Sequence, residues 1–107
     1  MPALPAPAGR LMGRSGPERS VEATVVRLAE ERGGIAIKLD SSVYKGIPDR
    51  LVLLPEGIIF FCETKAPKGV VSKIQAWWHG IIDGLGFDMH VPMSSADVEE
   101  IFIGYAD

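Results

Sequence analysis

The 107-residue sequence contains a single cysteine, Cys62, so no disulfide can form within the chain, and a reducing compartment suits it. No apolar run approaches the roughly 20 residues that a transmembrane helix requires, which excludes a membrane-spanning protein. Prolines interrupt the apolar residues near the N-terminus and leave no stretch of signal-peptide length. We therefore expect a soluble, cytoplasmic protein.

Acidic residues are absent from residues 1–16, which also lack a periodic apolar pattern and hold three prolines and three glycines. This composition predicts a flexible Pro/Gly-rich tail. Residues 17–107 then form one domain, which is large enough for one hydrophobic core. Because 47% of the sequence is hydrophobic, the chain as a whole is not predicted to be disordered.

Lysine and arginine are absent from residues 74–107, which hold six of the 14 acidic residues. All 11 basic residues lie between Arg10 and Lys73. This asymmetry favours a basic working face and an acidic remainder, although chance clustering of solvated charges explains it equally well. The net charge of −3 by itself gives no indication of nucleic-acid binding.

The apolar pattern predicts three helices and four strands in the order α-β-β-β-α-β-α. Helices are expected at residues 17–32, 71–85 and 96–103, and strands at 35–39, 50–54, 58–64 and 87–91. The turn Pro55-Glu56-Gly57 joins the second and third strands into a hairpin. Both of these strands are apolar on two faces, so we expect helices on both sides of a mixed sheet in an α/β fold.

The hairpin brings three charged side chains together. Asp49 precedes the first hairpin strand, and Glu63 and Lys65 share a face at the end of the second. Two carboxylates this close repel each other, and Mg²⁺ or Mn²⁺ held by oxygen ligands would relieve the repulsion. Such an ion can bind a phosphate oxygen and lower the pKa of a water, which is the chemistry of phosphodiester hydrolysis. The alternative is a surface ion pair between Glu63 and Lys65.

This pattern resembles the VRR-NUC (virus-type replication-repair nuclease) family of the PD-(D/E)xK nuclease superfamily. The matching segments are Gly46-Ile47-Pro48-Asp49-Arg50 and Phe61-Cys62-Glu63-Thr64-Lys65-Ala66-Pro67, and the similarity extends from about residue 20 to residue 101. The resemblance implies a restriction-endonuclease-like fold. It implies metal binding by Asp49, Glu63 and the Thr64 backbone carbonyl, with Lys65 as the catalytic lysine.

The same resemblance assigns two further residues. Glu22 matches a helix-borne acid that approaches the metal or its waters, and Gln75 matches a glutamine that supports the catalytic site. A solvated Glu22 and a helix-capping Gln75 are the alternatives. For His79 we favour a core or surface histidine whose hydrogen bonds are satisfied over one that contacts a phosphate. For Trp77 and Trp78 we favour packing in the core or a subunit interface over stacking on bases.

Five basic residues flank these positions in the sequence, and we expect them to form a rim that binds DNA: Lys38, Lys45, Arg50, Lys68 and Lys73. The sequence thus predicts a metal-dependent DNA endonuclease that cuts branched DNA, such as four-way junctions or flaps, in replication, repair or recombination. On the resemblance it would be a homodimer in the cytoplasm of a bacterial or phage-infected cell. The alternatives are a non-catalytic DNA-binding module and a subunit of a larger complex.

Overall fold

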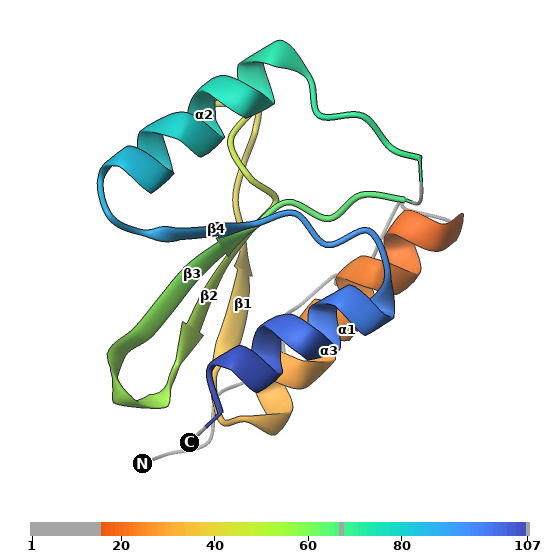
Figure 1. The fold of residues 1–107 in the computed structure, drawn as a ribbon, viewed down its shortest axis with the longest axis vertical. Coiled ribbons are helices and arrows are strands. Elements are labelled where there is room, and N and C mark those ends of the chain that lie inside the picture. The colour runs from red at the N-terminus through yellow and green to blue at the C-terminus, as the bar shows by residue number, and fades with distance from the viewer. Residues whose placement is uncertain (1–15, 67, 107) are drawn as a thin grey trace.

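The computed structural model describes residues 16–66 and 68–106, so the predicted tail, apart from Gly16, lies outside the described residues. Within the described part, three helices and four strands follow the predicted order, each within two residues of its predicted bounds (Figure 1). The elements are α1 (Gly16–Glu31), β1 (Ile35–Lys38), β2 (Arg50–Leu54), a 3-10 turn (Pro55–Gly57), β3 (Ile58–Cys62), α2 (Lys73–Gly84), β4 (Asp88–His90) and α3 (Ser95–Gly104). In that same part, no helix has the length and apolar character needed to cross a membrane.

The four strands form one mixed sheet in the order β1-β2-β3-β4. β2 is antiparallel to β1 and β3, whereas β3 and β4 run parallel. In the turn between β2 and β3, Glu56 and Gly57 both have positive φ angles, of 70° and 78°. This tight connection sets the hairpin register, in which Arg50 pairs with Cys62. The residues just outside that pair, Asp49 and Glu63, are therefore neighbours at the open end of the hairpin.

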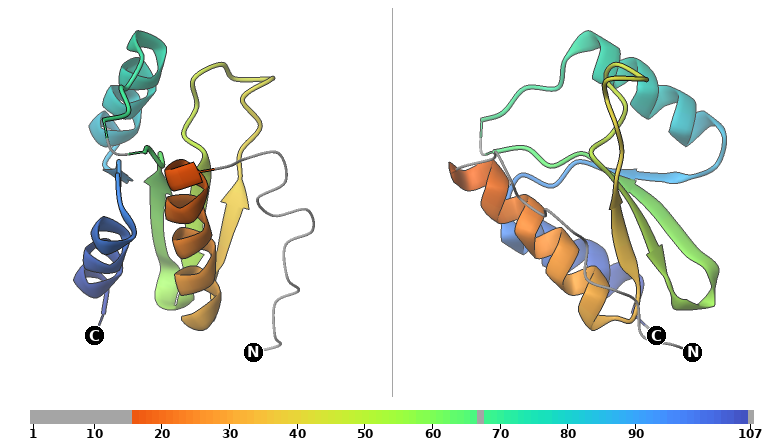
Figure 2. Two further views of the ribbon diagram at one scale, coloured as in Figure 1. Left: turned by 90° about the vertical axis from the view of Figure 1, so that its right-hand side faces the viewer. Right: turned by 180° about the vertical axis from the view of Figure 1, so that it is seen from behind.

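The hydrophobic core lies between the sheet and two helices. α1 and α3 lie side by side against one face, which we call the inner face (Figure 2). Val21, Val25 and Ala29 recur at helical spacing on α1, and each is at most 2% exposed. The inner face and α3 contribute Ala36, Val52, Phe60, Val98 and Phe102. The core therefore fixes α1 and the hairpin relative to each other.

The opposite, outer face of the sheet is covered only in part. Its side chains come from the alternate positions of the strands, and Ile37 and Ile59 remain 37% and 41% exposed. α2 lies against β4, near one end of the sheet, rather than along the strands (Figure 1). The prediction that helices cover both sides of the hairpin strands therefore holds fully for the inner face alone.

Candidate active site

Asp49 lies one residue before β2, and hydrogen bonds fix it on two sides. Its Oδ2 atom accepts hydrogen bonds from the backbone N–H of Thr64 at 3.1 Å and from the Thr64 hydroxyl at 3.0 Å. Its backbone carbonyl accepts a hydrogen bond from the N–H of Leu39 at 2.9 Å, which continues the pairing of β1 with β2. The Asp49 carboxylate is therefore held against the segment that follows β3.

That segment stays extended although β3 ends at Cys62, two residues earlier than predicted. The N–H of Glu63 donates to the carbonyl of His90 at 2.9 Å, and the N–H of Lys65 donates to that of Pro92 at 3.0 Å. Alternate residues of an extended segment share a face, so Glu63 and Lys65 project to the same side. The Glu63 carboxylate is buried, at 2% exposure, and the Lys65 side chain is half-buried.

The charges of this group affect two neighbouring side chains. Burial raises the pKa of the Cys62 thiol to about 12, and the negative charges of Asp49 and Glu63 add to the rise. Burial lowers the pKa of His79, and the positive charge of Lys65 lowers it further. Both effects require short distances. Two carboxylates, one ammonium and one imidazole therefore lie in the same region.

The loop that leads into Asp49 packs against α2. Gly46 has a φ of 84°, and a Cβ atom at this position would lie 2.7 Å from the Ile74 side chain, so glycine permits the close approach. The indole N–H of Trp78 donates to the carbonyl of Lys45 at 2.9 Å. These contacts position α2 beside the site, where Nε2 of His79 lies 3.9 Å from Oε1 of Glu63.

Arg50 follows Asp49 directly but lies beneath α1 on the inner face. Its Nε and Nη2 atoms lie 2.9 and 2.8 Å from Oε2 of Glu22, and its Nη1 donates to the carbonyl of Ala36 at 3.0 Å. Arg50 is 2% exposed and Glu22 is fully buried. The prediction that Arg50 belongs to a DNA-binding rim is therefore wrong, because its guanidinium holds Glu22 within the protein.

Two cations approach the Glu22 carboxylate. Besides Arg50, Nζ of Lys38 approaches its Oε2 at 3.6 Å. Across residues 16–66 and 68–106, no three His, Cys, Asp or Glu side chains are arranged to share one metal ion. In the structure Glu22 is paired with Arg50 and Lys38, and a role for it at the metal or its waters stays a prediction.

The Gln75 side chain caps the N-terminus of α2. Its Oε1 accepts a hydrogen bond from the N–H of Ser72 at 2.9 Å, and the Ser72 hydroxyl accepts one from the N–H of Gln75 at 3.3 Å. This reciprocal capping box begins the helix at Lys73, two residues later than predicted. In the structure Gln75 thus acts as a helix-capping residue. Its support of the catalytic site stays a prediction.

The other four predicted DNA-binding residues, Lys38, Lys45, Lys68 and Lys73, are all exposed. Lys38 ends β1, Lys45 lies on the loop held by Trp78, and Lys73 is the first residue of α2. Lys68 has a φ of 71° in the connection between β3 and α2. All four therefore lie on segments that lead into or out of the proposed site.

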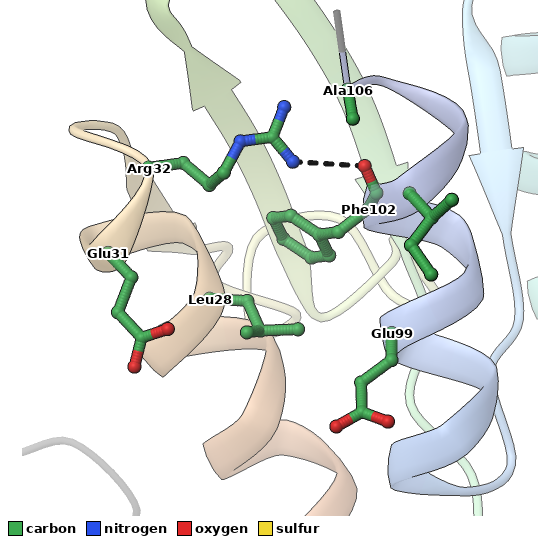
Figure 3. Close-up of a pocket in the computed structure, with 7 residues that line it drawn as sticks. Leu28, Glu31, Arg32, Glu99, Phe102 and Ala106 are labelled. Atoms are coloured by element: carbon green, nitrogen blue, oxygen red, sulfur yellow. Dashed lines mark hydrogen bonds between the residues drawn. The ribbon is translucent and has the colours of Figure 1, made fainter.

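A separate groove of about 350 Å³ lies between α1 and α3 (Figure 3). It is lined mainly by apolar atoms, with Leu28 and Phe102 among its lining residues. At its edge, Arg32 donates hydrogen bonds to the carbonyls of Phe102 and Tyr105, both at 2.9 Å. Those bonds satisfy carbonyls at the C-terminal end of α3. Asp49, Glu63 and Lys65 do not line this groove, so it is not part of the proposed site.

The proximity of His79 to Glu63 is the feature of this region that the sequence indicates least. His79 follows Gln75 by one helical turn, so the sequence already indicated that the two share a side of α2. Its approach to Glu63 depends on how α2 packs against the sheet. Spacing along the chain alone does not specify that packing.

No family model matches the sequence. The protein named "Putative nuclease p44", from Acyrthosiphon pisum secondary endosymbiont phage 1, is 39% identical to this chain over 84 residues, which make up 78% of this chain and 89% of p44. A solved structure described as a VRR_NUC domain matches with a TM-score of 0.77 and 29% sequence identity, covering 83% of this chain and 97% of that structure. On the shared fold and the identity to p44, the chain belongs to the VRR-NUC family of nucleases.

Proposed function

We propose that the protein is a metal-dependent DNA endonuclease that hydrolyses phosphodiester bonds in branched DNA. The observation that carries the proposal is the placement of Asp49, Glu63 and Lys65 at one end of the sheet. The similarity to p44 and to the VRR_NUC domain supports the nuclease activity. Two carboxylates can hold a divalent ion, and a lysine beside them can stabilise the negative charge that develops during such a hydrolysis.

The oxygen atoms at this position fit a hard divalent cation. Asp49 and Glu63 would supply carboxylate oxygens, and the backbone carbonyl of Thr64 would supply a third. Mg²⁺ and Mn²⁺ prefer such ligands. The charges of both carboxylates reach Cys62, so they also act on each other, and a cation would relieve that repulsion. When bound, such an ion would polarise the scissile phosphate and lower the pKa of a water at the site.

Within this chain, Lys65 is the group suited to act on the attacking water and the phosphate. Its half-buried ammonium is a hydrogen-bond donor that can orient a water and stabilise negative charge as it develops on the phosphate. Thr64 contributes by holding Oδ2 of Asp49 in one position. The protein thus pre-arranges both its acidic and its basic groups before DNA arrives.

The exposed lysines around the site would bind the DNA backbone. Lys45, Lys68 and Lys73 can each contact phosphates, and Lys38 can do so when it leaves Glu22. Contacts with phosphates do not distinguish one base sequence from another, so we propose that the shape of the DNA determines where the protein binds. Binding should weaken steeply as salt is raised.

We also propose that the protein acts as a symmetric homodimer. Two-fold symmetry would let two copies of the site address two strands of a four-way junction. The partly exposed outer face of the sheet, with Ile37, Ile59 and the neighbouring Phe87, offers an apolar surface for a second copy. Because p44 comes from a phage, we place this activity in the cytoplasm of an infected bacterium.

Cleavage of a panel of DNA substrates tests the proposal. Linear duplex, fork, flap and four-way-junction DNAs are incubated with the protein in Mg²⁺, in Mn²⁺ and in a chelator. We expect internal cuts that depend on the metal and that form fastest in a branched substrate. DNA that is bound but uncut in both metals would indicate a non-catalytic binding module, and equal cutting of linear and branched DNA would remove the structure specificity.

A further inference from the structure

His79 has a buried ring nitrogen beside the proposed site. Its side chain is 16% exposed, and Nε2 is buried without a hydrogen-bond partner among the residues that the structure describes. Oε1 of Glu63 lies 3.9 Å from Nε2. Buried side-chain nitrogens are nearly always hydrogen-bonded, so this one requires an explanation.

The tautomer of His79 determines what its Nε2 atom can do. A neutral imidazole carries one N–H and one lone pair, on different ring nitrogens. A carboxylate oxygen facing Nε2 favours the tautomer with the proton on Nε2, because that N–H can then point at the negative charge.

We propose that His79 is a positioning residue, whose Nε2–H holds the Glu63 carboxylate in the orientation needed for metal binding. The inference rests on the proposed function. A shift of about 1 Å would bring the 3.9 Å separation to hydrogen-bond distance. Carboxylates that bind metals are commonly oriented by such hydrogen bonds, and loss of one typically lowers metal affinity about 10- to 100-fold.

Three variants test this role: His79→Ala, His79→Gln and, as a matched control, Asp83→Ala. Asp83 is exposed one turn further along α2. Mn²⁺ binding to the DNA-free protein is measured by calorimetry, and thermal unfolding is followed in parallel. We expect His79→Ala to weaken Mn²⁺ binding about 10- to 100-fold. We expect His79→Gln, whose side-chain amide can also donate a hydrogen bond, to restore part of the affinity, and Asp83→Ala to bind as the unaltered protein does.

The separation of kcat from KM distinguishes positioning from folding. With DNA as substrate, His79→Ala should lower kcat and leave KM for DNA nearly unchanged. Unaltered Mn²⁺ affinity in His79→Ala would overturn the inference. The inference would also be overturned if the loss of Mn²⁺ affinity in His79→Ala simply followed a lower melting temperature and His79→Gln restored none of it.

A spectroscopic measurement tests the contact without relying on catalysis. Nitrogen NMR of the metal-free protein reports which ring nitrogen of His79 carries the proton. We expect the Nε2–H tautomer, with an Nε2 signal that moves in Glu63→Gln. The Nδ1–H tautomer would overturn the inference even if the protein proves an active nuclease. If the expected tautomer is found but no DNA is cut, the proposed function fails while the contact stands.

Discussion

The Asp49 carboxylate is anchored by Thr64, the residue between the proposed catalytic Glu63 and Lys65. One oxygen of Asp49 accepts both the N–H and the hydroxyl hydrogen of Thr64. Thr64 is fully buried, so both of its donors are shielded from water on their own side of the bond. A single residue of the third strand's extension therefore couples the two halves of the site. Any change at Thr64 acts on Asp49 first.

We predict that Thr64→Val lowers both stability and cleavage. Valine has nearly the same shape but no hydroxyl, so Asp49 keeps the backbone N–H and loses the second donor. The free energy of unfolding should fall by about 1.5–3 kcal/mol, as for other hydrogen bonds to a charged group. Urea unfolding and single-turnover cleavage measure the two effects. Thr64→Ser retains the hydroxyl and should behave nearly as the unaltered protein; equal behaviour of the Val and Ser variants would contradict the anchoring role.

We predict that Arg50 contributes to folding more than to DNA binding. Arg50→Met leaves the fully buried Glu22 without its closest cation, which should cost about 3–5 kcal/mol of unfolding free energy. In the double variant Glu22→Leu/Arg50→Met, no buried charge is left unpaired, so much of the loss should be recovered. Chemical unfolding of the four proteins in this cycle gives the coupling. If Arg50→Met were as stable as the unaltered protein but bound DNA weakly, the buried pairing would be refuted.

Most of the fold could be predicted because local signals agreed with each other. The turn Pro55–Gly57 lies between two apolar runs, which left little doubt about the hairpin and its register. That register in turn placed Asp49 beside Glu63. The apolar pattern predicts a start for α2 at residue 71, two residues early, because the Ser72 capping box and not the apolar pattern decides where the helix begins.

The parts of the site that could not be predicted depend on which way a side chain points. Arg50 and Asp49 are adjacent in sequence, but successive residues of a strand project to opposite faces. Arg50 is therefore buried under α1 and paired with Glu22. The proximity of His79 to Glu63 depends on the docking of α2 through Trp78 and Ile74. Sequence spacing reports neither relationship.

We predict that Lys65→Ala abolishes cleavage while junction DNA still binds. Lys65 is the basic group proposed to act beside the two carboxylates, whereas the exposed lysines around it would supply most of the attraction for DNA. A mobility-shift assay in Ca²⁺ and a cleavage assay in Mn²⁺ separate the two properties. Lys68→Ala is the comparison: it should weaken binding modestly, lessen its salt dependence and leave the chemical step intact. Cleavage by Lys65→Ala at the normal rate would remove Lys65 from the mechanism.

We predict that Cys62 makes the protein less stable at alkaline pH. The pKa of its thiol is about 12 in the folded protein, against the ordinary value of 9.0 expected in the unfolded chain, so the unfolded chain loses this proton first. The stability that this thiol contributes is therefore fully present below pH 9 and is lost as the pH rises further, by about 1 kcal/mol between pH 8 and pH 10. Cys62→Ala should lower stability at every pH through lost packing but remove this part of the decline. Urea unfolding at the two pH values measures the difference, and identical declines would show that the thiol is not responsible.

We predict that a charge on the outer face of the sheet prevents dimer formation. Ile59 is 41% exposed, so Ile59→Glu should leave the core intact while placing a charge on the surface proposed to bind a second copy. Two such charges near a two-fold axis repel and resist burial, which should convert the dimer into a monomer. Analytical ultracentrifugation reports the mass, and circular dichroism confirms the fold. Ile103→Glu, at a 70% exposed position on α3, is the control and should remain dimeric. If the unaltered protein sediments as a monomer at high concentration, or if Ile59→Glu stays dimeric, the outer face is not the dimer interface, and paired cuts across a junction require another explanation.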